Sequence, residues 1–279
     1  MKVAAIQMVS GMDVSANLAQ ARRLLQEAAQ AGAELAVLPE YFCLMGQRDA
    51  DKLAIQEPFG QGPIQQFLSE SAIESGLWLV GGTLPLSAPA NSPEGQKQPG
   101  RVFNSSLVFS PAGQCVARYD KMHLFRFDNG IESYDESLVL APGQQPVTFD
   151  LASADGHTWR IGLSVCYDLR FAELYRHYAR AGAQLMLVPS AFTHTTGQDH
   201  WEVLLRARAI ENLAYVAAAA QGGLHDNQRR TWGHAMLVNP WGKLLAERAT
   251  GPGVVVADLA WDVMTRCRSR LPALDHRLL

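Results

Sequence analysis

Short apolar segments of strand length recur along the whole chain, and several are separated by longer segments with apolar residues at helical spacing. The pattern predicts strands at 3–8, 35–38, 77–81, 106–110, 161–166, 185–188, 215–220, 235–239 and 254–257. It predicts helices at 14–31, 63–76, 171–182 and 199–214. Strands that alternate with helices are typical of βαβ units, so we predict an α/β fold with a largely parallel core and helices outside.

Two turns interrupt this alternation. The segments 110–114 and 239–243 contain the Pro and Gly residues that are typical of turns, and each is predicted to join a β-hairpin. The core is therefore expected to contain antiparallel pairs as well. The segment 87–100 is rich in Pro, Ser, Gly and Gln, and we interpret it as a surface loop, because strand patterns of the same kind continue on both sides. One domain over 1–279 is predicted.

Composition narrows the class of protein. A hydrophobic share of 48% and a charged share of 18% indicate a soluble globular protein with a sizeable core. The net charge of -3 gives no general attraction to nucleic acid or to an anionic membrane, and we expect neither as a partner. No apolar run is long enough to span a bilayer. The chain turns polar at Gln7, too early for a signal peptide, which predicts a cytoplasmic location.

The cysteines show no metal-binding or disulfide pattern. None of them has CxxC spacing, and in a reducing cytoplasm all are expected to be free thiols: Cys43, Cys115, Cys166 and Cys267. We therefore expect no metal site and no cofactor, while one cysteine remains open to chemistry.

Three residues with side chains that can take part in catalysis follow predicted strands or stand at their ends. Glu40 follows Leu-Ala-Val-Leu-Pro, Lys121 stands in Tyr-Asp-Lys-Met-His-Leu-Phe, and Cys166 ends Arg-Ile-Gly-Leu-Ser-Val-Cys. Each has an ordinary explanation as well: a solvated carboxylate, a surface ion pair with Asp120, and a small buried side chain. His123 is interpreted as a packed, hydrogen-bonded histidine rather than a general base.

Together these residues are sufficient for amide hydrolysis. A thiol that attacks an amide needs a base, and a carboxylate in an apolar pocket can serve, which suits Glu40. The tetrahedral intermediate carries an oxyanion that an ammonium group such as Lys121 can stabilise. Cys166 would lie near the amino end of the next helix, whose dipole is expected to lower the pKa of the thiol.

The three motifs, in this order, resemble the nitrilase superfamily of carbon–nitrogen hydrolases over nearly the whole chain. The resemblance implies a four-layer αββα sandwich with two mixed β-sheets. It also implies that Cys166 is the nucleophile, Glu40 the general base and Lys121 the oxyanion stabiliser. Glu136, in Tyr-Asp-Glu-Ser, matches the family's second glutamate, which positions the lysine and the substrate.

The carboxyl-terminal third resembles the amidase branch, which contains omega-amidase and deaminated glutathione amidase. The segment 201–211 and the Ala-Ala-Gln at 219–221 are closer to the second, so the expected substrate is a small carboxylate-bearing amide of a 2-oxo acid, deaminated glutathione first. The segment 126–132 departs from the Asp-x-Pro-Gly pattern of both enzymes, a departure that concerns substrate identity. The alternatives are 2-oxoglutaramate, a nitrile or N-carbamoyl substrate, and a partner protein without catalysis.

A substrate that carries carboxylates needs cationic or N–H donors in its pocket. Arg170 follows the nucleophile, and the resemblance places Arg126 and His194 on loops near the pocket. With Tyr167 and Phe192 they form the predicted set of substrate contacts, although salt bridges and surface loops would explain the charged members equally well.

The resemblance also implies a homodimer or a larger homo-oligomer, because this family commonly pairs through helices beside the active site. Aromatic residues at Phe171, Tyr175 and Tyr178 would suit such an interface. The alternative is that they pack inside the monomer.

Overall fold

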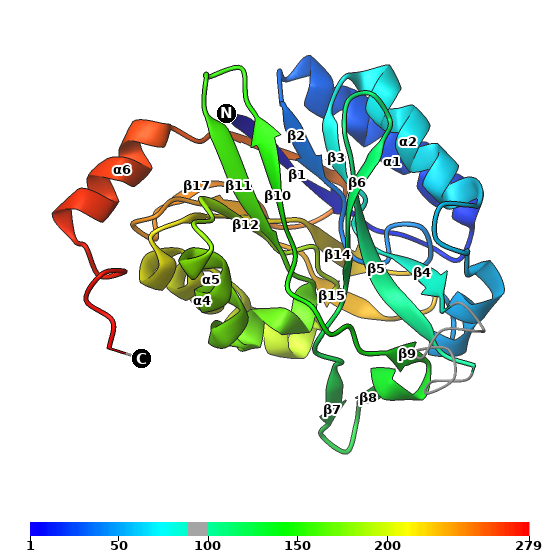
Figure 1. Cartoon of the computed structure of the whole chain (residues 1–279). Helices are drawn as coiled ribbons and strands as arrows, with labels where there is room; N and C mark the ends of the chain where they lie inside the picture. The colour runs from blue at the N-terminus through cyan, green and yellow to red at the C-terminus, as the bar shows by residue number, and fades with distance from the viewer. Residues whose placement is uncertain (89–99, 279) are drawn as a thin grey trace.

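Two β-sheets lie face to face, with helices on both outer sides (Figure 1). The computed structural model describes residues 1–88 and 100–278. The first sheet contains β1 (Lys2–Met8), β2 (Leu35–Val37), β3 (Trp78–Val80), β4 (Leu84–Ser87), β5 (Val102–Phe109), β6 (Cys115–Asp120), β9 (Leu140–Ala141), β14 (Ala220–Leu224), β15 (Arg230–Trp232) and β18 (Gly253–Asp258). The second contains β10 (Thr148–Ala152), β11 (Thr158–Leu163), β12 (Leu185–Leu187), β13 (Tyr215–Ala218), β16 (Ala235–Val238) and β17 (Leu244–Arg248).

Smaller elements complete the chain. A separate hairpin is formed by β7 (Arg126–Asp128) and β8 (Ser133–Asp135). The α-helices are α1 (Val14–Gln30), α2 (Pro63–Ser75), α4 (Ala172–Arg180), α5 (His194–Asn212) and α6 (Trp261–Arg270). Short 3₁₀ helices are η1 (Asp49–Ile55), η2 (Glu136–Leu138) and η3 (Cys166–Arg170). No helix in the described part of the chain is long and apolar enough to cross a membrane.

The alternation of side chains along a strand explains the layers. In β1, Val3 and Ala5 belong to the hydrophobic cluster between the sheets, whereas Ala4 and Ile6 belong to the cluster under α1 and α2. Both faces of this strand are therefore buried, as is typical of a parallel strand covered on both sides. The predicted αββα sandwich is confirmed.

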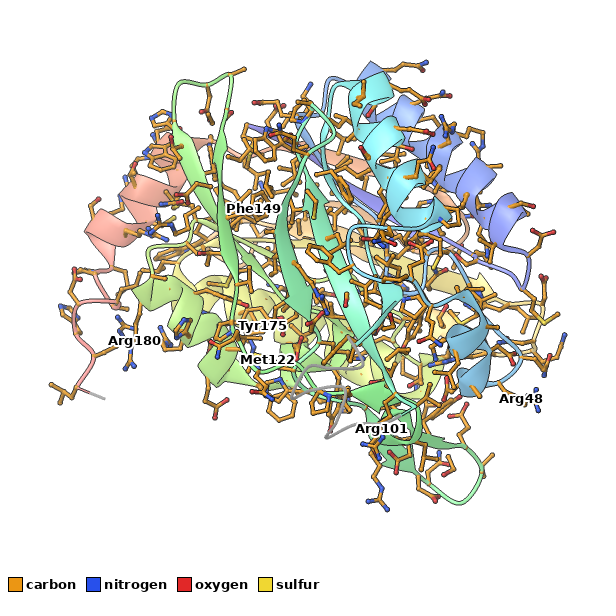
Figure 2. All side chains as sticks on the ribbon, turned by 45° about the vertical axis from the view of Figure 1, so that its right-hand side comes forward. Arg48, Arg101, Met122, Phe149, Tyr175 and Arg180 are labelled. Carbon is orange, nitrogen blue, oxygen red and sulfur yellow. The ribbon has the colours of Figure 1, made fainter. Side chains whose placement is uncertain are left out.

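Packing between the sheets brings Trp78 of β3 against Phe149 of β10, with ring centroids 6.1 Å apart. Figure 2 shows Phe149 and Tyr175 in the interior, while Arg48 and Arg180 lie at the surface. The sandwich thus has a continuous apolar centre and a charged periphery.

The predicted mixture of parallel and antiparallel pairs is confirmed. Strands β1, β2 and β3 pair in parallel, and so do β11, β12 and β13. The predicted hairpins at 110–114 and 239–243 are the antiparallel pairs β5–β6 and β16–β17.

Several details differ from the prediction. The segment 215–220 is not one strand: β13 lies in the second sheet and β14 in the first, so the chain crosses between sheets at Ala219. The strand predicted at 161–166 ends at Leu163, and Cys166 begins η3. Most of the surface loop predicted at 87–100, namely residues 89–99, lies outside the described residues.

The aromatic residues of α4 do not form an exposed face. Tyr175 and Tyr178 are fully buried within the chain, where the Tyr175 hydroxyl lies 2.7 Å from Ser164 Oγ and the Tyr178 hydroxyl donates to the Leu163 carbonyl. Their proposed part in an interface is therefore wrong, because strand β11 already covers them.

Candidate active site

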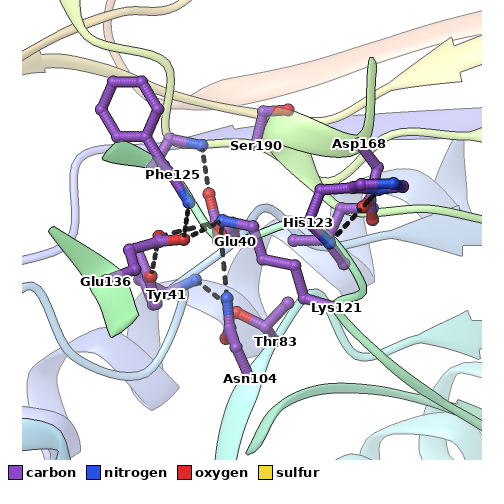
Figure 3. A network of polar contacts seen from close by, with 12 residues as sticks. Glu40, Tyr41, Thr83, Asn104, Lys121, His123, Phe125, Glu136, Asp168 and Ser190 are labelled. Carbon is purple, nitrogen blue, oxygen red and sulfur yellow. Dashed lines mark hydrogen bonds and ion pairs between the residues drawn. The ribbon is translucent and has the colours of Figure 1, made fainter. Parts of the chain in front are cut away.

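The residues that follow β2 and β6 meet the turn after β11 at one place (Figure 3). Lys121 Nζ donates to Glu40 Oε1 at 2.9 Å and to the two carboxylate oxygens of Glu136 at 2.9 and 2.8 Å. The thiol of Cys166 adjoins this group closely enough for the charges of Glu40 and Lys121 to act on its ionisation. The structure therefore brings Glu40, Lys121, Cys166 and Glu136 together.

Lys121 is held as a buried ammonium. Its side chain has no exposed surface. Burial acts to lower the pKa of Lys121, but the charges of Glu136 and Glu40 outweigh it and leave the pKa well above its ordinary value. A cation is thus fixed beside the thiol at every ordinary pH.

Glu40 is fixed by both halves of the sandwich. Its Oε1 accepts a second hydrogen bond, at 2.9 Å, from Asn104 Nδ2 in β5. Its Oε2 accepts from the backbone N–H of Ala191 at 3.0 Å, in the segment that follows β12. A carboxylate held this way keeps one orientation, which a general base requires.

The backbone around Glu40 depends on a close approach. Tyr41 has a φ of 57°, and its N–H donates to Thr83 Oγ1 at 2.9 Å. Gly82, with a φ of 52°, packs so closely that a Cβ there would lie 2.1 Å from the Pro39 carbonyl oxygen. Only glycine permits this contact, which supports the turn that presents Glu40.

Glu136 is the second carboxylate on Lys121. It accepts from the Tyr41 hydroxyl at 2.7 Å and from the N–H of Phe125 at 2.7 Å. Burial acts to raise the pKa of Glu136, but Lys121 and these donors lower it, so the group stays ionised. Its contacts suit a residue that positions the ammonium.

Cys166 has a φ of 51°, and its N–H donates to the Pro189 carbonyl at 2.9 Å. Burial and the charge of Glu40 raise the pKa of the thiol well above its ordinary value, and the opposing effect of Lys121 does not cancel them. The predicted lowering of this pKa is therefore wrong. The loss of water and the adjacent carboxylate keep the thiol protonated, so it needs a base to lose its proton.

The carboxylate of Asp168 joins the cysteine turn to the lysine segment. It is fully buried and accepts from the N–H of Val165 at 2.8 Å and from the Tyr119 hydroxyl at 2.7 Å. It also lies 2.7 Å from His123 Nδ1, and the His123 ring stacks on Phe171 with centroids 3.7 Å apart. His123 is therefore packed and hydrogen-bonded, as predicted.

A pocket opens above the thiol. Its lining residues are Phe125, Cys166, Tyr167, Arg170, Ala191, Phe192, Thr193 and Thr196. The Arg170 guanidinium lies 5.7 Å from the ring centroid of Tyr167 and 5.5 Å from that of Phe192. Its nitrogens lie 3.3 Å from His200 Nδ1. Three of the predicted substrate contacts, Tyr167, Arg170 and Phe192, are thus gathered beside Cys166.

The other two predicted contacts lie elsewhere. Arg126 is largely exposed on β7, with its Nε 3.7 Å from an Asp135 oxygen. His194 begins α5 and meets the ring of Trp232 edge-on at 5.0 Å. Neither lines the pocket over Cys166.

Sequence reasoning missed several residues of this site, among them Asn104 and Asp168. Asn104 stands in Val-Phe-Asn-Ser-Ser-Leu-Val-Phe, and a polar residue within an apolar strand was the available signal, because a buried amide needs a partner. Asp168 follows Cys166 by two positions and carried no signal of its own.

The comparisons with known proteins agree with this geometry. The family described as carbon-nitrogen hydrolase matches residues 2–269. The chain is 38% identical over 277 residues to deaminated glutathione amidase of Synechocystis sp. (strain PCC 6803 / GT-S), covering 99% of this chain and 97% of the relative. It is 37% identical over 278 residues to human omega-amidase NIT2, with 99% and 94% covered.

A solved structure shares the fold. The Saccharomyces cerevisiae protein Nit3, described as a member of branch 10 of the nitrilase superfamily, superposes with a TM-score of 0.86 at 31% identity, covering 100% of this chain and 97% of Nit3. The resemblance inferred from the three motifs is confirmed. The chain belongs to the carbon–nitrogen hydrolase family, in the nitrilase superfamily.

Proposed function

We propose that this amide-hydrolysing enzyme acts through a covalent intermediate on Cys166, with Glu40 as general base and Lys121 as oxyanion stabiliser. The observation that carries the proposal is the buried ammonium of Lys121 held between Glu40 and Glu136 beside the thiol. Glu136 is assigned the positioning of Lys121. The proposed unit is one carbon–nitrogen hydrolase domain over 1–279, and the matched range 2–269 supports it.

In the first half of the reaction, Glu40 accepts the thiol proton as Cys166 Sγ attacks the amide carbonyl carbon. The tetrahedral intermediate carries a negative oxygen, which the Lys121 ammonium stabilises. Glu40 then gives its proton to the leaving nitrogen, the carbon–nitrogen bond breaks, and a thioester on Cys166 remains.

In the second half, Glu40 accepts a proton from water as the water oxygen attacks the thioester carbonyl. The carbon–sulfur bond breaks, the acid is released, and the proton returns to Cys166 Sγ. These reaction steps balance with water as the only co-substrate, so Glu40, Lys121 and Cys166 suffice without a metal or cofactor.

The proposed substrate is a small amide of a 2-oxo acid, deaminated glutathione first and 2-oxoglutaramate second. The support is the names of the two relatives at 37–38% identity. We expect kcat/KM to be highest for deaminated glutathione, lower for 2-oxoglutaramate, and lowest for a plain aliphatic amide, because pocket groups gain energy only from a substrate that carries carboxylates. Ammonia or amine release is measured for each, with the Cys166→Ala protein as the blank.

A higher kcat/KM for the aliphatic amide would contradict recognition of a carboxylate. A higher rate with a nitrile or an N-carbamoyl substrate, assayed in parallel, would favour those branches of the superfamily. Either result leaves the proposed cysteine chemistry intact.

A homodimer or larger homo-oligomer stays a prediction from the resemblance. Light scattering at micromolar concentration is expected to give at least twice the chain mass of 30.5 kDa. A mass of 30.5 kDa, that of a monomer, would contradict the prediction. The cytoplasmic location also stays a prediction.

A further inference from the structure

A second cation, Arg229, lies beside the candidate site, and one N–H of its guanidinium has no hydrogen-bond partner among the described residues. Arg229 ends the turn between β14 and β15. In this turn His225 N donates to the Arg229 carbonyl, and Arg229 N donates to Asn227 Oδ1, both at 2.9 Å. Asn227 Nδ2 donates to the carbonyl of Gly46 at 2.6 Å, and Gln228 adopts a φ of 66°. The turn is therefore held in one conformation beside the segment that follows Glu40.

The guanidinium of Arg229 lies 4.9 Å from the ring centroid of Tyr134. Its Nε is buried and has no hydrogen-bond partner within residues 1–88 and 100–278. The carboxylates around it are engaged by other cations, since Asp49 pairs with Lys52 at 2.6 Å and Glu136 with Lys121 at 2.8 Å. A buried donor without a partner is uncommon in proteins and points to a ligand.

The ring that Arg229 stacks on leads toward the pocket, because the Tyr134 and Phe125 ring centroids lie 5.8 Å apart and Phe125 lines the pocket with Cys166. Burial acts to lower the pKa of Arg229. The phenols of Tyr41 and Tyr134 and the carboxylates of Asp49 and Glu40 act to raise it, and the net shift is upward. The guanidinium therefore stays charged, within electrostatic reach of Glu40.

The charges of the site explain why a second cation is needed to bind an anionic substrate. Two carboxylates, Glu40 and Glu136, face the single ammonium of Lys121, so this group alone would repel an anion. A guanidinium stacked on a ring keeps its N–H edges free, and its Nε edge matches both oxygens of a carboxylate.

We propose that Arg229 is a specificity-determining residue that binds the carboxylate at the acyl end of the substrate, distal to the scissile amide. The inference rests on the proposed function, and it deepens it by assigning a second cationic contact besides Arg170. Arg170 lines the pocket with Cys166, whereas Arg229 approaches from Tyr134 and Tyr41.

The kinetic test uses two amides of equal length, glutaramate and pentanamide, which differ in a terminal carboxylate. Arg229→Met is expected to lower kcat/KM for glutaramate about 10- to 100-fold, mainly through KM, the scale of a lost charged hydrogen bond. For pentanamide the change is expected to stay within about threefold. Arg229→Lys keeps the charge but not the paired N–H edge and should fall between. Arg230→Met, at the exposed neighbouring position, is the matched control and should change neither substrate.

A binding test does not depend on turnover. Calorimetry with glutaramate compares Cys166→Ala with Cys166→Ala/Arg229→Met, and the dissociation constant is expected to rise at least about tenfold. Loss of turnover in equal proportion for both amides would show a purely structural charge and overturn the inference. So would an unchanged dissociation constant, or no binding of glutaramate to Cys166→Ala.

These experiments distinguish a failure of the proposed function from a failure of the Arg229 inference. If the wild type hydrolyses neither amide while glutaramate binding still depends on Arg229, the function is wrong and the inference stands. If pentanamide is hydrolysed through Cys166 while glutaramate gains nothing from Arg229, the inference is wrong and the function stands. Melting temperatures show whether Arg229→Met folds, and Arg229→Lys supplies the answer if it does not.

Discussion

Replacing Cys166 by alanine is expected to abolish amide hydrolysis while leaving the fold intact. No other thiol is placed to take over the attack. Cys43 is buried in the hydrophobic cluster under α1 and α2, Cys115 is exposed on β6 and Cys267 lies on α6, and none of the three lines the pocket with Cys166. The substitution removes one sulfur atom and leaves the Lys121 and Glu136 contacts in place. Turnover should fall to the level of a blank, and the melting temperature should stay within a few degrees, which circular dichroism measures.

Iodoacetamide labelling followed by peptide mapping provides the control. Cys115→Ala/Cys267→Ala removes the exposed and the half-buried thiol and should keep full activity, so loss of activity on alkylation, together with the peptide map, can then be assigned to Cys166. Measurable turnover by Cys166→Ala would remove the covalent mechanism. Failure to label Cys166 would revive the alternative of a protein without catalysis.

The same variant tests the ionisation of the thiol. The folded protein holds the pKa of Cys166 above the ordinary value of 9.0, so the thiol stabilises the fold at lower pH, and this contribution is lost as the pH rises above 9.0. The free energy of unfolding of the wild type should therefore fall more steeply above pH 9 than that of Cys166→Ala. Equal slopes would indicate a thiol that ionises freely.

Replacing Lys121 by methionine is expected to reduce both activity and stability. Activity should fall at least about a hundredfold, the scale of a lost oxyanion donor. The two buried carboxylates would then face each other without a cation, which costs about 3–5 kcal/mol. Like charges raise each other's pKa, so the folded state would bind a proton at a pH where the unfolded chain does not. The loss of stability should therefore be smaller at pH 5 than at pH 8, as denaturant titrations at each pH would show.

A double variant separates the two effects. Lys121→Met/Glu136→Gln removes one of the facing carboxylates and should recover part of the stability but none of the activity. Lys243→Met, at an exposed lysine, is the control and should change neither. Recovery of activity by the double variant, or near-normal turnover by Lys121→Met, would remove Lys121 from the mechanism.

The convergence of the candidate site was predictable from the sequence because strand ends share an edge. Glu40 and Cys166 stand just after or at the ends of predicted strands, and Lys121 follows the second arm of the hairpin predicted at 110–114. The carboxyl ends of strands in α/β sheets form the ligand crevice. The family resemblance then fixed their roles as expectations. Short apolar runs predicted the main strands, and apolar residues at helical spacing predicted the helices, because both patterns are local properties of the sequence.

What the sequence could not predict depends on contacts between distant segments. The residues at 215–220 are uniformly apolar, so nothing marks the crossing at Ala219 from one sheet to the other. The role of Asn104 follows only once β5 has been placed beside Glu40. Arg229 stands in a polar turn, where a charged residue is ordinary, and its lack of a partner is a property of the folded chain.

The two anchors of Glu40 have a consequence for inactivation. One hydrogen bond comes from Asn104 in the first sheet and the other from Ala191, which follows a strand of the second. The carboxylate of Glu40 is therefore aligned only while the two sheets keep their mutual position. In a molten-globule state, each sheet keeps much of its backbone bonding while the packing between sheets is lost. Such a state would keep its secondary structure but lose its catalytic activity. Loss of activity would therefore indicate loss of packing between the sheets.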